Sequence, residues 1–479
     1  MKTKYDAVVV GSGPNGFAAA ITLQRRGLSV LLVEAKETLG GGVSSAALTL
    51  PGFIHDVCAS VFALAEDSPV FKYFNLQQSG LEYVAPEYAI AHPFDDGNAI
   101  AVETSIENTA RQLGKDAGNY QRIFSPLVKE WPSIRSAFVS PLHWSDPTKE
   151  KLQFAWNALS SGIHFAKNNF QTQKAQSLFA GMAAHSMVPL HKVTTSSIAL
   201  VLNTLAHING WPLVKGGAQQ LTNALAACFQ SFGGEIQTGN KITSLQQLPA
   251  KKIILLDVTP AQLLSIGHDH FSALYKWQLR QYQYGEGVFK VDWALARPVP
   301  FLNQKCRRAA TVHIGGNIDE ISKSEAMIGK GMYPEKPFVL FVQPSVADPS
   351  RAPEGKQTAW AYCHVPNGSV KNMTDAIEQQ IERFAPGFSD CILARHTMNT
   401  ADMQDYNSNY VGGDINGGAA IATQIFTRPV LRLSPYRTSA KGVYVCSSST
   451  PPGGGVHGLC GYYAARRAVK DVYGVDLGW

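Results

Sequence analysis

The sequence predicts an α/β fold in which separate parts of the chain join in one parallel sheet, with an α+β unit inserted between those parts. Three observations carry this prediction. The chain opens with a strand, a helix and a strand; a similar pattern returns near residue 210; and a short strand leads through a glycine-rich segment into a final helix. Strands that alternate with helices are typical of parallel sheets. With 479 residues, 45% of them hydrophobic, the chain can form two or three domains.

The first strand, helix and strand carry a fingerprint. Residues 7–10 form an apolar run of strand type, and residues 11–16, GSGPNG, fit the pattern G-x-G-x-x-G. Residues 17–26 have a helical pattern, and residues 29–33 form a second apolar strand that leads to Glu34. This pattern between a strand and a helix, with an acid after the next strand, predicts dinucleotide binding; the alternative is a turn without a ligand.

Each part of the fingerprint has a physical role. Gly11 lets the strand turn sharply, and Gly13 lets backbone N–H groups approach a pyrophosphate without a Cβ in the way. Gly16 allows the helix to pack close to the sheet, and Glu34 can accept hydrogen bonds from a ribose diol.

A run of glycines follows soon after Glu34. Gly40, Gly41 and Gly42 allow a second close approach of the backbone to a cofactor. FAD, whose ring extends away from the pyrophosphate, would use such an approach, whereas NAD would not need it. The alternative interpretation is a flexible surface loop.

A second glycine-rich junction lies near the other end of the chain. Residues 442–446 form a short strand, residues 447–458 read SSSTPPGGGVHG, and residues 459–473 have a helical pattern. A helix N-terminus behind an unencumbered backbone can hold negative charge. In a flavoenzyme it can stabilise the anionic N1–C2=O locus of reduced flavin; the alternative is a glycine-rich surface turn.

The middle of the chain alternates between two characters. Near residue 210 the α/β pattern returns, with a helix at 219–232 and strands at 235–238 and 253–256. These segments are expected to rejoin the N-terminal unit. We therefore expect an FAD-binding domain in three pieces and an inserted α+β substrate-binding domain with a helical, lid-like part. The FAD-binding domain comprises residues 1–80, 210–283 and 433–479, and the substrate-binding domain comprises residues 81–209 and 284–432. Strand-like runs in the substrate-binding domain, at 288–293, 338–342 and 358–364, suggest an antiparallel sheet.

One helix of the inserted part is amphipathic. Apolar residues recur at three- and four-residue spacing from 152 to 170: Leu152, Trp156, Leu159, Ile163, Ala166 and Phe170. Such spacing predicts a helix with one apolar face. We expect this face to pack on its own domain; the alternative is a lid or a membrane-contacting helix beside an apolar substrate channel.

Composition excludes several classes of protein. The net charge of +6 arises from 42 basic and 36 acidic residues without a basic run, so nucleic-acid binding has no support. The 7 cysteines never form C-x-x-C, which disfavours a disulfide framework, a redox disulfide and a metal site, and favours a reducing compartment. No signal peptide or apolar run of membrane-spanning length is apparent. We expect a cytoplasmic protein, or one peripheral to the inner membrane (the mitochondrial matrix in a eukaryote).

These motifs together resemble the FAD-dependent phytoene-desaturase-like oxidoreductases, within the glutathione-reductase-fold superfamily that also includes amine oxidases. The internal motifs are most similar to the branch of pyridine nucleotide-disulfide oxidoreductase domain-containing protein 2. The resemblance covers essentially the whole chain and rests on VVVGSGPNGFAAA, PGFIHDVCASVFALA, WPLVKGGAQQLTNAL, YGEGVFKVDWAL, YCHVPNGS, NYVGGDINGG and STPPGGGVHGLCGYYAA.

The resemblance implies a glutathione-reductase-type fold, FAD as the cofactor, and a set of cofactor-binding residues. The ADP part would be held by Gly11, Ser12, Gly13, Gly16 and Glu34; the segment along the pyrophosphate and ring by Gly41, Gly42 and Val43; and the flavin side by Gly454, Gly455, Val456, His457 and Gly458. His457, just before the final helix, is also the candidate catalytic residue; the alternative is a histidine that only bonds the turn.

The chain also departs from that family. After the Phe-x-x-Asp element, Asp56 is followed by Val57 and Cys58 where many carotenoid desaturases continue with a glycine, which weakens the inference that phytoene is the substrate. A second G-x-G-x-x-G between a strand and a helix is absent. Reduced flavin is therefore expected to pass electrons to oxygen, a quinone or a membrane acceptor.

The expected reaction is hydride transfer from a small apolar substrate, of isoprenoid or lipid-like type, to flavin N5, with the protein positioning the substrate and tuning the ring. Three alternatives stay open: a flavin-dependent isomerase without net redox change, an amine oxidase, and a non-catalytic FAD-containing interaction protein. Peripheral membrane contact and self-association are both compatible with the sequence.

Overall fold

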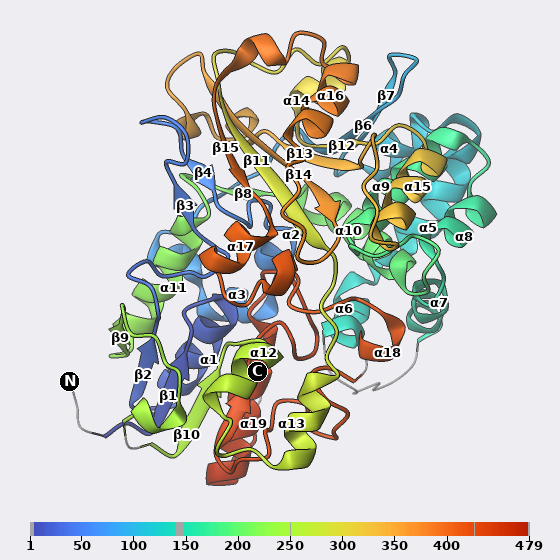
Figure 1. Ribbon diagram of the computed structural model, residues 1–479. Coiled ribbons are helices and arrows are strands. Elements are labelled where there is room, and N and C mark those ends of the chain that lie inside the picture. The colour runs from blue at the N-terminus through green and yellow to red at the C-terminus, as the bar shows by residue number, and fades with distance from the viewer. Residues whose placement is uncertain (1–3, 140–147, 250, 426, 478–479) are drawn as a thin grey trace.

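A computed structural model describes residues 4–139, 148–249, 251–425 and 427–477. Two sheets organise this part of the chain (Figure 1). The first is a parallel sheet of five strands in the order β16-β10-β1-β2-β9. Its strands are β1 (Ala7–Val10), β2 (Val30–Val33), β9 (Glu235–Gln237), β10 (Ile253–Leu256) and β16 (Val443–Val445).

Helices cover both faces of the parallel sheet. Alternate strand residues such as Val9 and Leu32 pack with α1 (Pro14–Gln24), α11 (Gln219–Ser231) and α19 (Leu459–Tyr473). The strand residues between them, such as Val8 and Leu31, point to the opposite face and pack with α12 (Pro260–Ile266) and α13 (Ala273–Arg280). Strands buried on both faces are typical of doubly wound α/β folds, which confirms the predicted fold class.

The second sheet has seven strands and is mixed. Its order is β15-β11-β14-β13-β12-β6-β7, and only the β12–β6 pair is parallel. The strands are β6 (Tyr88–Pro93), β7 (Ala99–Val102), β11 (Gly287–Leu295), β12 (Ala309–Ile314), β13 (Val339–Val342), β14 (Gln357–Val365) and β15 (Ile392–Met398). One face is covered by an apolar cluster that includes residues of α14 (Gln304–Arg308) and α16 (Thr374–Phe384).

A helical layer lies beside this sheet, on the right in Figure 1. It contains α4 (Ile106–Arg111), α5 (Ala117–Lys129), α6 (Trp131–Val139), α7 (Lys149–Ala158), α8 (Gly162–Asn169), α9 (Gln173–Ala184), α10 (Thr195–Asn209) and α15 (Ile318–Ile328). The remaining short elements connect the layers: β3 (Ser45–Ala46), β4 (His55–Asp56), α2 (Ala63–Asp67), α3 (Pro69–Phe74), β5 (Tyr83–Val84), β8 (Leu213–Val214), α17 (Thr400–Tyr406) and α18 (Ala422–Ile425).

The first sheet joins distant parts of the sequence. Its strands come from residues 7–33, 235–256 and 443–445, while the second sheet is built from residues 88–102 and 287–398. Helix α1 packs against α19, and Gly461 permits this, since a Cβ there would lie 1.8 Å from the Asn15 carbonyl oxygen. The domain boundaries themselves stay a prediction.

The prediction of one amphipathic helix over residues 152–170 was wrong. The segment forms two helices, α7 and α8, because the Ser161 side chain caps a new helix start by accepting the His164 N–H at 3.2 Å. The apolar positions consequently do not share a face. Ala166 and Phe170 are buried, whereas Trp156 is 80% exposed.

Candidate functional site

One cavity of about 560 Å³ lies where the two sheets meet. The carboxyl ends of β1, β2 and β10 open into it, and part of the seven-stranded sheet forms its other side. Crevices outside the carboxyl ends of parallel strands are where ligands bind in open α/β sheets. We call the side at the parallel sheet the cofactor half and the side at the mixed sheet the substrate half.

The predicted site residues divide into two groups by their position. Nine of them line the cavity: Gly11, Ser12, Gly13, Glu34, Gly41, Gly42, Val43, Gly455 and Val456. Gly16, Gly454, His457 and Gly458 lie outside the lining, in the turns that support it. The structure thus brings the N-terminal turn, the glycine run and the C-terminal junction together at one cavity.

Tight backbone packing shapes the turn after β1. A Cβ on Gly16 would lie 2.0 Å from the Gly11 carbonyl oxygen, so only glycine fits at the start of α1. Pro14 occupies the first turn of this helix, which begins three residues before the predicted segment. Proline suits that position because its missing N–H would have no partner there.

Glu34 ties three segments together at the cavity. Its carboxylate accepts the Ser12 N–H at 2.8 Å and the Ser12 hydroxyl at 2.6 Å, and it also accepts the Lys36 N–H at 3.0 Å. Ser12 Oγ in turn accepts the Gly40 N–H at 3.0 Å. Glu34 therefore holds the turn after β1 against the glycine run, in addition to facing the cavity. Its predicted contact with a ribose stays a prediction.

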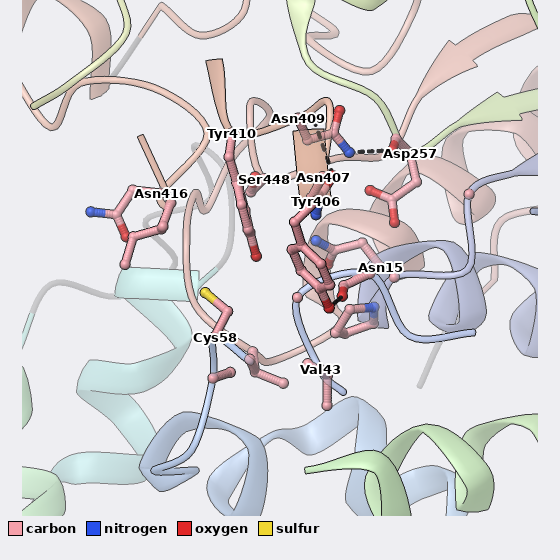
Figure 2. Close-up of a pocket in the computed structure, with 18 of the residues that line it drawn as sticks. Asn15, Val43, Cys58, Asp257, Tyr406, Asn407, Asn409, Tyr410, Asn416 and Ser448 are labelled. Carbon is pink, nitrogen blue, oxygen red and sulfur yellow. Dashed lines mark hydrogen bonds between the residues drawn. The ribbon is translucent and has the colours of Figure 1, made fainter. Parts of the chain in front are cut away.

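Asp257, at the end of β10, is a cavity residue that the sequence analysis missed. Its Oδ2 accepts the Gly16 N–H at 2.9 Å, and a Cβ on Gly13 would lie 2.7 Å from the same oxygen. Burial, reinforced by the negative charge of Glu34, raises the pKa of the Asp257 carboxyl to about 7. Asn409 donates from Nδ2 to the Asp257 carbonyl oxygen at 3.1 Å, as Figure 2 shows. A carboxyl that carries its proton more readily than an ordinary aspartate thus lies beside the predicted pyrophosphate turn.

Two tyrosines cover the Gly41–Val43 segment. Figure 2 shows Tyr406 and Tyr410 reaching toward Val43 and Cys58. Tyr406 donates to the Gly41 carbonyl oxygen at 2.6 Å, and a Cβ on Gly42 would lie 1.9 Å from the Tyr410 hydroxyl. Neither tyrosine had a predicted role, although Tyr410 belongs to the motif NYVGGDINGG.

The C-terminal junction contributes backbone more than side chains. Gly455 and Val456 line the cavity, while the buried ring of His457 accepts the Leu459 N–H at Nδ1, 3.1 Å away. Burial lowers the pKa of His457 to about 4, against hydrogen bonds to the backbone of the preceding glycines that raise it. These contacts make His457 an organiser of the turn; its catalytic role stays a prediction.

The substrate half has a different chemistry. Its lining is mainly apolar and aromatic: Val61, Leu64, Trp211, Leu340, Trp360, Tyr362 and Ile415, with Thr311 and His185 among them. Trp360 and Tyr362 stack with ring centroids 5.9 Å apart. Mostly apolar walls with a few polar groups are typical of small-molecule sites.

Within the described ranges, no cluster of three histidine, cysteine or acidic side chains has the geometry of a metal site. The same residues contain no helix that is long and apolar enough to cross a membrane. All seven cysteines are free thiols.

Comparisons with known proteins agree with this geometry. Residues 9–75 match the model of an NAD(P)-binding Rossmann-like domain. The chain is 23% identical to pyridine nucleotide-disulfide oxidoreductase domain-containing protein 2 from Mus musculus, over 98% of this chain and 94% of that protein. It is 22% identical to a polypeptide of the limonene dehydrogenase from Castellaniella defragrans (99% and 96% covered) and 24% identical to the lycopene-forming phytoene desaturase from Pantoea ananas (95% and 96% covered). The chain is a homologue of the phytoene desaturases.

Solved structures show the same fold. An oxidoreductase from Methanosarcina mazei superposes with a TM-score of 0.63 at 16% identity, covering 96% of this chain and 99% of that one. A putrescine oxidase bound to putrescine also gives 0.63, at 15% identity, with 98% and 99% covered. Together with the relatives, this confirms the resemblance to FAD-dependent phytoene-desaturase-like oxidoreductases. The relatives support the expectation that the chain is an oxidoreductase.

Proposed function

We propose that the protein binds FAD and acts as a dehydrogenase of the desaturase type, moving a hydride from an apolar substrate to flavin N5. The observation that carries this proposal is a continuous cavity whose lining runs from Gly11 and Glu34, past Gly41–Val43 and Gly455, to the apolar substrate half. A pyridine nucleotide alone would not need the second and third of these segments.

The residues present fit FAD. Glu34 would hold the ribose of the adenosine part, and the backbone from Gly11 to Asn15, at the N-terminus of α1, would hold the pyrophosphate. The raised pKa of Asp257 supports this, because a carboxyl that takes up a proton near pH 7 repels the anion less than a fully ionised one would. Gly41 to Val43 and Gly455 to Val456 would lie along the ring side. When bound, FAD supplies the hydride acceptor.

The substrate half supports an apolar substrate. Trp211, Leu340 and Trp360 form walls that exclude water and orient a hydrocarbon skeleton. The relatives named limonene dehydrogenase and phytoene desaturase support an isoprenoid or lipid-like molecule. The electron acceptor in this proposal is oxygen or a quinone.

Exposed apolar side chains support peripheral contact with a membrane. Leu152, Trp156 and Leu159 on and after α7 are 52%, 80% and 52% exposed. Apolar side chains of this kind insert at the boundary between headgroups and acyl chains. Contact at α7 would bring the enzyme to a lipid-soluble substrate.

The experiment starts from the purified protein, with and without reconstitution with FAD. Its visible spectrum and the flavin released on denaturation identify the cofactor. Anaerobic mixing with candidate terpenes and extracted lipids is expected to bleach the flavin band. A flavin left unchanged while the substrate isomerises would replace the proposal with an isomerase, and rapid reoxidation with peroxide release on amines would replace it with an amine oxidase. Failure to retain any flavin after reconstitution would refute FAD binding.

A further inference from the structure

The floor of the substrate half is one face of the mixed sheet. Strand pairing places Thr311 opposite Val342 and Val342 opposite Trp360, in one row across β12, β13 and β14. The next row on the same face holds His313, Leu340 and Tyr362. Thr311, Leu340, Trp360 and Tyr362 all line the cavity. The rows thus place several polar groups beside the aliphatic side chains of Leu340 and Val342.

Two of these polar groups lack a hydrogen-bond partner in the part of the chain that the structure describes. Thr311 is 1% exposed and Trp360 is 4% exposed, yet neither Thr311 Oγ1 nor Trp360 Nε1 has a hydrogen-bond partner among the described residues. Buried polar atoms in native proteins are nearly always paired, and leaving one unpaired is costly. Their neighbours in the rows, Leu340 and Val342, are apolar and cannot pair them. Both groups can donate a hydrogen bond.

A third polar group faces the same space from the helical layer. His185 caps the C-terminus of α9 and lines the cavity. Its Nε2 lies 2.9 Å from Nε2 of His313, so one of these nitrogens donates and the other accepts. Burial lowers the pKa of His185 to about 3, which keeps the ring neutral at pH 7. Since either nitrogen of the pair can carry the proton, Nδ1 of His185 can serve as a donor or as an acceptor.

Charges on this face are already compensated. Lys290 and Asp292 of β11 lie next to Tyr362 and Trp360 in the sheet and form a buried ion pair with each other. His364, further along β14, pairs with Glu325 at 2.7 Å. A charged ligand group at Thr311 and Trp360 would therefore be buried without a free counter-charge from these residues, which is costly.

We propose that Thr311, Trp360 and His185 bind a neutral oxygen function, a hydroxyl or a carbonyl, of an otherwise apolar substrate. The oxygen accepts hydrogen bonds from the Thr311 hydroxyl and the Trp360 indole, and His185 adopts the tautomer that suits a carbonyl or a hydroxyl. The surrounding aromatic and aliphatic side chains take the hydrocarbon part. This inference rests on the proposed function, in which the other half of the cavity holds FAD.

The test uses matched ligands and the FAD-loaded protein. Limonene, perillyl alcohol, perillic acid and perillylamine share one skeleton and differ in the group attached; phytol, phytene, phytanic acid and phytylamine repeat the comparison in a longer chain. Binding is followed by calorimetry and by the shift of the flavin spectrum. We expect the alcohol of at least one series to bind about tenfold or more tightly than its hydrocarbon, acid and amine, as two or more hydrogen bonds allow.

Substitutions in the protein test which residues bind the oxygen of the alcohol. Thr311→Val removes one donor at nearly constant shape and should weaken binding of the alcohol about threefold to tenfold while leaving binding of the hydrocarbon unchanged. Trp360→Phe removes the indole N–H together with part of the aromatic wall, so it should weaken binding of the alcohol more than binding of the hydrocarbon. His185→Phe should do the same. Trp156→Phe, on the exposed surface of α7, is the matched control and should bind all ligands like the parent protein. Unchanged flavin content and thermal stability in the Thr311 variant would exclude a merely structural effect, since its hydroxyl has no hydrogen bond to lose among the described residues.

Three results would overturn the inference: equal affinity for alcohol and hydrocarbon, preference for the acid or the amine, and no binding by any member of either series. Each of these results counts only when it is measured on protein that has retained FAD. Protein that retains no flavin would instead refute the proposed function, so the two failures are distinguishable.

Discussion

The two halves of the cavity are built from different materials. The cofactor half is organised around backbone turns at Gly11 to Asn15, Gly41 to Val43 and Gly455 to Val456, each after or between short strands. The substrate half consists of side chains, several of them on strands β12, β13 and β14. In the first, a single added Cβ collides with another part of the backbone, as at Gly16; in the second, a side chain can be exchanged for one of similar shape.

This difference determines what a substitution in each half should change. Backbone turns present N–H groups whose positions are fixed by packing, so a substitution there acts on the fold and on the cofactor together. Side chains on a rigid sheet act on a ligand with little effect on the fold. Variants in the two halves should therefore separate flavin content from ligand preference.

The largest effect is expected from Gly16→Ala. The new Cβ would lie 2.0 Å from the Gly11 carbonyl oxygen and force the turn after β1 to move. We expect loss of FAD and a fall in the free energy of unfolding of about 3 kcal/mol, because overpacking at rigid sites costs about that much. Flavin content and urea unfolding measure both. Gly118→Ala in α5, where a Cβ meets open space, is the control; a Gly16 variant that behaved like it would break the comparison.

Asp257 should give the cofactor half a pH dependence. Its pKa is about 7 in the folded protein and near 3.8 when unperturbed, so the folded state binds this proton more tightly. Stability should therefore fall as pH rises from about 4 to about 7, by at most about 1.4 kcal/mol per unit for this group. Asp257→Asn should flatten the curve measured by urea unfolding. The raised pKa of Glu286, also about 7, contributes in the same direction and stays in the variant. If the free energy of unfolding changed with pH equally in the parent protein and in Asp257→Asn, the raised pKa could not belong to Asp257.

A smaller effect is expected from Glu34→Ala. The change leaves the Ser12 N–H and hydroxyl without their acceptor and removes the proposed ribose contact. We expect the affinity for FAD to fall about tenfold, the equivalent of about 1.4 kcal/mol, with thermal stability changed less than in Gly16→Ala. Titration of the flavin-free protein with FAD measures this. Glu37→Ala, at an exposed acid nearby, should retain the parent affinity; a similar loss in both variants would count against Glu34 as a ribose ligand.

The smallest effect on the fold is expected outside both halves, at α7. Trp156→Ser removes a side chain that is 80% exposed, so the free energy of unfolding should change by less than about 0.5 kcal/mol. Co-sedimentation with vesicles of phosphatidylcholine and phosphatidylglycerol should nevertheless decrease. Leu393→Ser, an exposed apolar position on β15, should leave sedimentation unchanged. Parent protein that does not sediment with vesicles would refute contact through α7.

The cofactor half was largely predictable from the sequence, because glycine-rich turns have few structural solutions. Strands β1 and β10 and helix α19 have the bounds that the pattern predicted. The reason for Gly13 was incomplete, however, since the group that approaches it here is the Asp257 carboxyl from the end of β10, in a distant part of the sequence. Contacts across such separations leave no local signal.

The substrate half was not predictable in the same way. Alternation along β12 and β14 indicates strands, but it does not tell which alternate set faces a ligand and which faces α14 and α16. Thr311 and Trp360 become neighbours only through the pairing of both strands with β13. The error at residues 152–170 has a related cause, because apolar spacing alone does not reveal the cap at Ser161 that starts a second helix.

The packing of α1 against α19 has a consequence for the order in which the protein is made. The fingerprint emerges from the ribosome long before residues 459–473, which cover its helix, and before β16, which completes the sheet edge beside β10. Until those residues are synthesised, the face of α1 that receives Gly461 is open to water or to other proteins. The part of the chain that is easiest to recognise is thus among the last to be closed, and a nascent chain stalled before β16 would present the dinucleotide turn without the segment that completes its cavity.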